Sequence, residues 1–313
     1  MAGYTDAARL IDGDTLRAVR LAIGGDLGSF SPPPDPDPAL VDVVDRPFES
    51  VEDAADRLSR LESRLRERGD RRAVFLTIYA RMTREVHDGI EGGIFRDPTW
   101  MRRYVIAFAN HYRRAFLAFE RGELERVPDP WRIAFATAVR GDALVVQDAV
   151  LGVNAHINYD LALAIDEIGM DPNRADKHAD HRAINGILAR LVDVQQDALA
   201  EIYAAGIDDV DAAFGRLDEA FTLLSMTEGR EQAWRIATVL TDVHVPPIAS
   251  YARWVLWATA TGGAFFALGP RLDPTLRRTL HAVESEGTDL DTAVELIRTR
   301  LEESAATSDA PRR

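Results

Sequence analysis

Helical periodicity is the feature of this sequence that most restricts its fold. Between about residues 46 and 302, apolar residues recur at intervals of three and four, and no run alternates with period two over more than four residues. Helix start and stop signals divide this stretch, for example Asp97-Pro98 at one start and Gly122 at the next stop. The sequence therefore predicts an all-α fold: one bundle-like domain of about eight or nine helices over residues 46–302.

The two ends of the chain differ from this domain. Residues 1–45 contain one short amphipathic stretch and then GGDLGSFSPPPDPDP, whose glycines and prolines cannot continue a helix. Residues 303–313 are mostly small and polar. We expect an N-terminal appendage with a Pro-rich linker at 1–45 and a disordered tail at 303–313.

Composition restricts the partners and the chemistry. The chain has 37 basic and 51 acidic residues, a net charge of -14, which repels phosphate backbones and predicts no nucleic-acid binding. Lys177 is the only lysine, and an acid excess with so little lysine is typical of halophilic proteins, although GC-rich codon usage has the same effect. With no cysteine, a metal ion would need His, Asp, Glu or Asn ligands.

Neither export nor membrane insertion is expected. The N-terminal residues have no basic end followed by an apolar run and a cleavage site, which predicts a cytoplasmic protein. Residues 254–270 carry no charge, but 17 residues with three glycines are short against the ~20 apolar residues of a membrane span. We expect this segment to be a core helix.

Four hydrogen-bonding side chains interrupt an apolar helical run at LGVNAHINYD, residues 151–160: Asn154, His156, Asn158 and Asp160. Burying such groups without partners costs several kcal/mol, so they must meet other polar groups. Helical spacing puts further polar residues on apolar faces, and these are the expected partners: His111, Tyr112, Asp148, Asp180, His181 and Asn185. We predict one polar pocket centred on His156.

Three interpretations of this pocket remain open. His156 and Asp160, four residues apart on a helix, could ligate a divalent metal ion; with His181 they would form a metal-assisted hydrolase. The cluster could instead be an inert hydrogen-bonded network that fixes helix register. Alternatively, the bundle could bind a small, lipid-like molecule or an interaction partner, because 254–270 is apolar and no complete catalytic motif is present.

Residues 72–270 resemble an uncharacterised helical family, domain of unknown function 5995. The resemblance rests on these segments: GIFRDPTWM (93–101), FANHYRRAF (108–116), WRIAFATA (131–138), VLGVNAHINYDLALA (150–164), HRAINGILARLVDVQQDAL (181–199) and REQAWRIA (230–237). It supports His156 as the centre of the site and implies no reaction.

A fainter similarity is to helical zinc hydrolases of the phospholipase C and P1 nuclease type, which use His-x-x-x-Asp pairs. It extends only to His156 and Asp160. The chain lacks the N-terminal Trp ligand of those enzymes and enough paired histidines for three zinc ions.

Overall fold

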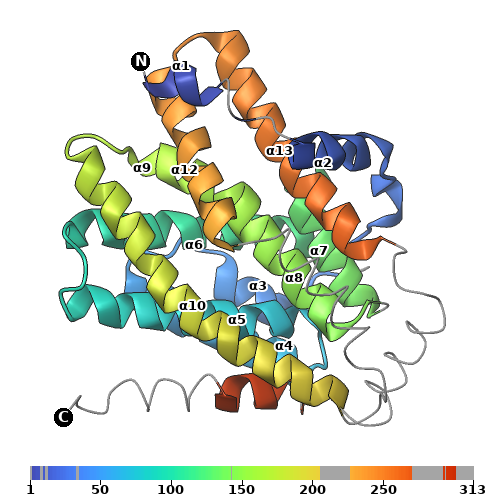
Figure 1. Cartoon of the computed structure of the whole chain (residues 1–313). Helices are drawn as coiled ribbons and strands as arrows, with labels where there is room; N and C mark the ends of the chain where they lie inside the picture. The colour runs from blue at the N-terminus through green and yellow to red at the C-terminus, as the bar shows by residue number, and fades with distance from the viewer. Residues whose placement is uncertain are drawn as a thin grey trace.

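The structure, a computed structural model, is all-helical in the part that it describes (Figure 1). That part comprises residues 2–7, 10, 13–32, 35–141, 143–204, 226–269, 292 and 294–300, with the backbone alone for 2, 14, 190–204 and 226. The all-α prediction is confirmed, and no strand occurs within these ranges. Twelve α-helices are present there, more than the eight or nine predicted.

The N-terminal half of the core is built from five helices. They are α3 (Pro38–Val44), α4 (Val51–Glu67), α5 (Arg72–Glu91), α6 (Pro98–Glu120) and α7 (Asp129–Arg140). Ser50 caps α4 by accepting from the Asp53 amide at 3.0 Å, and Asp97 caps α6 by accepting from the Trp100 amide at 2.9 Å. Gly122 follows α6 with φ 69°, a left-handed conformation that ends the helix.

The polar motif lies in a helix with an irregular centre. α8 (Val145–Ala155) passes into a π-helical turn, His156–Asp160, and continues as α9 (Leu161–Ile168). A π-turn is a one-turn widening of an α-helix that is frequent at functional sites. This interruption and the short N-terminal helices account for the larger number of helices.

The C-terminal part adds three long helices and meets the start of the chain. α10 (Arg174–Ala204), α12 (Met226–Asp242) and α13 (Pro246–Leu268) follow in order. α1 (Ala2–Ala7) lies against α12, and α2 (Gly13–Gly24) lies along α13 (Figure 1). Part of the expected appendage therefore packs on the helices that follow it in sequence. The expected tail, 303–313, lies outside the described residues.

Most of the described residues of the apolar segment at 254–270 are packed into the protein, as predicted, although Trp254 is exposed. Residues 254–268 belong to α13, which buries several small and aliphatic side chains: Ala252, Val255, Leu256, Ala258, Ala260 and Ala264. In the described part of the chain, no helix has the length and apolar character needed to cross a bilayer.

Candidate functional site: a polar cleft beside the π-turn

The motif helix presents its polar residues on two opposite faces. Asn154 and Asn158 line a cleft, whereas His156 and Asp160 are buried among aromatic rings on the other side. The structure does not bring all four side chains into one pocket. Since each helical residue turns by about 100°, side chains two positions apart point about 200° away from each other.

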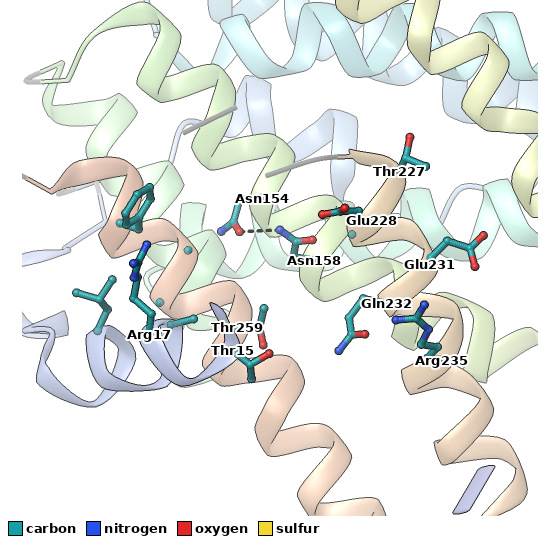
Figure 2. Close-up of a pocket in the computed structure, with 16 residues that line it drawn as sticks. Thr15, Arg17, Asn154, Asn158, Thr227, Glu228, Glu231, Gln232, Arg235 and Thr259 are labelled. Atoms are coloured by element: carbon teal, nitrogen blue, oxygen red, sulfur yellow. Dashed lines mark hydrogen bonds between the residues drawn. The ribbon is translucent and has the colours of Figure 1, made fainter. Parts of the chain in front are cut away.

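The cleft has a volume of about 540 Å³ and lies between α2, α12, α13 and the π-turn. Figure 2 shows Asn154 and Asn158 beside each other, with Gln232 and Arg235 of α12 on one side and Arg17 of α2 on the other. Thr15, Thr227, Glu228, Glu231 and Thr259 complete the polar lining. Three segments far apart in sequence thus contribute charged or amide groups to one cavity.

Hydrogen bonds and close packing fix the two asparagines. Asn154 Nδ2 donates to the carbonyl of Ala260 at 2.7 Å, and Asn158 Nδ2 donates to Asn154 Oδ1 at 3.0 Å. A Cβ on Gly263 would lie 2.6 Å from Asn154 Oδ1, and one on Gly229 would lie 2.4 Å from Asn158 Oδ1. Both positions require glycine because any side chain would displace the amides from the cleft.

The charges of the cleft are unevenly paired. Glu231 accepts from Arg182 Nε at 2.7 Å and contacts His178 Nε2 at 3.3 Å. Burial acts to raise the pKa of Glu231, but these two partners outweigh it and the pKa falls below its usual value. Arg17 and Arg235 pair with no carboxylate of the described residues. As far as the described residues show, the cleft therefore offers two guanidinium groups to a ligand.

On the opposite face, His156 makes the predicted contact with Asp160. Its ring stacks on Phe108 at 3.6 Å between centroids, and its Nδ1 lies 3.3 Å from Asp160 Oδ2. Trp131 Nε1 donates to the same carboxylate oxygen at 2.8 Å, whereas His156 Nε2 has no hydrogen bond. Burial lowers the pKa of His156 and raises that of Asp160, which favours the uncharged form of each.

Two of the predicted residues of α10, His181 and Asn185, lie in a separate cluster around Arg230. His181 Nδ1 lies 2.9 Å from Tyr104 Oη, and Arg230 Nε donates to Asn185 Oδ1 at 2.8 Å. Asp180 instead accepts from the main-chain amides of Arg96 and Asp97 at 2.8 and 2.7 Å, and so fixes the approach to α6. None of the three predicted residues Asp180, His181 and Asn185 lines the cleft.

The remaining predicted pocket residues are also dispersed. His111 pairs with Glu167 at 3.0 Å near the surface, and burial together with the charge of Arg114 lowers the pKa of His111 to about 4. Tyr112 belongs to the aromatic group around His156, with 6.4 Å between ring centroids. Asp148 forms an ion pair with Arg71 at 2.6 Å.

No metal centre is visible in the described ranges, where no three His, Asp or Glu side chains lie close enough together to hold an ion. The sequence prediction also missed the cleft residues outside the motif. Arg17 and Arg235 carry no signal in sequence, but Gly262-Gly263 inside an apolar helix indicates a close approach to another group.

Fold and site together define an all-helical protein with a polar cleft between its helices. The model of a family described as "Family of unknown function (DUF5995)" matches residues 51–264, and the chain belongs to this family. The resemblance carried by the Asn-Ala-His-Ile-Asn motif is thereby confirmed. No curated protein and no solved structure matches the chain. The matched range includes both asparagines and most of α13 but not α2.

Proposed function

We propose that this protein binds a small polar molecule with an anionic group in the cleft beside the π-turn. The observation that carries the proposal is a pair of guanidinium groups, those of Arg17 and Arg235, which line the same cavity as Asn158 and pair with no carboxylate of the described residues. A cavity of about 540 Å³ has the size of a small-molecule site. Guanidinium groups bind carboxylate or phosphate oxygens, and an amide supplies both a donor and an acceptor.

The lipid-like ligand suggested by the apolar segment has less support. The aliphatic side chains of α13, such as Val255 and Leu256, are buried in the core and are not available to line a binding site. The cleft is lined by Ala18, Leu21 and Phe266 but also by amide, hydroxyl and charged groups, and an alkyl chain would leave these polar groups without partners.

A metal-dependent hydrolase also has little support, because its substrate would need access to the proposed ion. His156 and Asp160 are only 3% and 1% exposed, and Phe108 and Tyr79 cover the imidazole. This geometry favours the interpretation of that pair as a structural network. Cytoplasmic location, adaptation to salt and the absence of nucleic-acid binding remain predictions from the sequence.

Thermal unfolding of the full chain with a panel of small molecules tests the proposal. The panel contains carboxylates, phosphate esters, amino acids and neutral sugars at equal ionic strength. A ligand of the anionic classes should raise the melting temperature in proportion to its occupancy. Calorimetric titration of that ligand should then give about tenfold weaker binding to Arg235→Ala, since a hydrogen bond to a charged group is lost.

Arg46→Ala is the matched control, because this side chain is 87% exposed, far outside the cleft lining, and contacts only Asp45 at 3.9 Å. The control should bind like the unmodified protein. Stabilisation by the neutral sugars alone, or equal affinities of Arg235→Ala and Arg46→Ala, would contradict the proposal.

A further inference from the structure

The orientation of the Asn158 amide is fixed by two successive hydrogen bonds. A carbonyl only accepts, so Asn154 must direct its Nδ2 to the carbonyl of Ala260, at 2.7 Å. The Oδ1 of Asn154 then accepts from Asn158 Nδ2 at 3.0 Å. The other polar atom of Asn158, Oδ1, is therefore an acceptor, and a ligand that contacts it must supply a hydrogen-bond donor.

A carboxylate lies at the same end of the cleft as this acceptor. The first turn of α12 packs directly against Asn158, because a Cβ on Gly229 would lie 2.4 Å from Asn158 Oδ1. The preceding residue, Glu228, lines the cleft, and its side chain extends toward Asn158 in Figure 2. An ammonium group, with three donors and a positive charge, matches such a pair of acceptors. A hydroxyl group supplies one donor and no charge.

The lining of the cleft carries charges of both signs. Among its described residues, Arg17 and Arg235 are cationic, and Glu228 and Glu231 are anionic. Glu228 and Arg235 are separated by nearly two turns of α12, so they lie on one face of the helix with ~10 Å between them along its axis. A simple anion would be attracted to Arg235 but repelled by the carboxylates. A molecule with charges of both signs would meet an opposite charge at each of its two charged groups.

We propose that the ligand of the cleft is a small zwitterion: a primary amine that also carries a carboxylate or phosphate group. Its ammonium group donates to Asn158 Oδ1 and to the Glu228 carboxylate, and its anionic group accepts from the Arg235 guanidinium. This inference rests on the small-molecule site proposed above. It adds the positive charge of the ligand and the two residues that recognise it.

The test compares pairs of molecules that differ only by the amino group. The pairs are α- and ω-amino carboxylates of two to six carbons with the corresponding carboxylates, and 2-aminoethyl phosphate with ethyl phosphate. Calorimetric titration of the full chain at equal ionic strength measures each affinity. In the pair that binds most tightly, the amino member should bind at least about tenfold more tightly than its partner, because it adds hydrogen bonds to a charged group.

Glu228→Gln removes the negative charge and keeps the size of the side chain. Glu228 is exposed and lies in the first turn of α12, so the variant should fold. It should lose the tenfold preference, while its affinity for the plain carboxylate or phosphate stays the same or increases. Glu125→Gln is the matched control, since this acid is also exposed and is not among the residues that line the cleft. The control should keep the preference.

Equal affinities within every pair would overturn the zwitterion and leave the anion site proposed above intact. Binding of other anions from the wider panel, with no binding of any amino member, would also overturn this inference alone. If no anion of either panel binds, the proposed function fails as well. A preference that persists in Glu228→Gln would overturn the assignment of the ammonium group to this carboxylate.

Discussion

At the scale of single residues, the two motif asparagines have different environments although they lie four positions apart. Asn154 is fully buried and bonds to both α13 and Asn158. Asn158 is half-buried, and its Oδ1 faces the cleft without a partner among the described residues. Asn154 therefore holds α13 against the π-turn, and Asn158 is the one of the two that can contact a ligand.

This difference predicts opposite effects of substitution. Asn154→Leu should lower the free energy of unfolding by about 2 kcal/mol, because Asn158 Nδ2 and the Ala260 carbonyl both lose a buried partner. Asn158→Ala should cost less than about 1 kcal/mol and should weaken ligand binding. Urea unfolding followed by circular dichroism measures both values. Equal losses of stability would show that the two amides share one structural role.

At the scale of elements, the contact between α2 and α13 depends on one glycine. A Cβ on Gly262 would lie 2.0 Å from the carbonyl oxygen of Ala18, so the two helices could not keep their present distance. α2 forms one wall of the cleft and lies outside the range matched by the family model. The shape of the cleft therefore depends on the contact between α2 and α13 as well as on the motif.

We predict that Gly262→Ala separates α2 from α13. The substitution should lower the free energy of unfolding by about 1–3 kcal/mol through overpacking and should expose α2 to trypsin at Arg17 and Arg20. Gly186→Ala in α10 is the matched control, since a Cβ there meets nothing within 4 Å, and it should stabilise the helix by up to ~1 kcal/mol. Unchanged proteolysis of Gly262→Ala would mean that α2 accommodates the methyl group without moving.

The sequence predicts where helices begin and end better than it predicts which residues of other helices they contact. Caps and glycine stops locate α4 and α6, because such signals act within one turn of the helix. Helical spacing also places Asn154 and His156 on opposite faces, a conclusion available from the sequence alone. What each face meets is set by tertiary packing: Arg230 reaches His181 across 49 residues, and periodicity within one helix contains no information on that pairing.

The π-turn itself has no signal in the sequence that we can identify. The motif helix reads as continuous because Val150, Leu161 and the residues between them all tolerate helical geometry. The structure shows a widened turn at His156–Asp160, where the side chains of Asp160 and Trp131 meet. The turn is therefore defined by contacts between helices, which a local pattern does not record.

At the scale of the whole molecule, the buried histidines make stability depend on pH. Burial lowers the pKa of His156 and of His181 well below 6.5, and burial with the charge of Arg114 lowers that of His111 to about 4. In the unfolded chain all three titrate near 6.5. Below that pH the unfolded state therefore binds protons that the folded state does not, and acidification favours unfolding.

The expected result is a free energy of unfolding that is highest near neutral pH and falls steeply as the pH drops through 6. Each histidine contributes a slope of up to about 1.4 kcal/mol per pH unit, so the three together approach about 4 kcal/mol per unit. Asp160 opposes them: burial raises its pKa, so the folded state takes up this proton at higher pH than the unfolded chain and gains stability on acidification. Urea unfolding between pH 7.5 and 5 measures the sum of these contributions.

His111→Gln isolates one contribution, because this imidazole lies near the surface and its loss disturbs little packing. Between pH 7.5 and 5.5 the variant should lose about 1 kcal/mol less stability than the unmodified protein. Identical pH profiles of the two proteins would show that His111 has the same pKa in the folded and unfolded states, and a flat profile of both would contradict neutral burial of all three histidines.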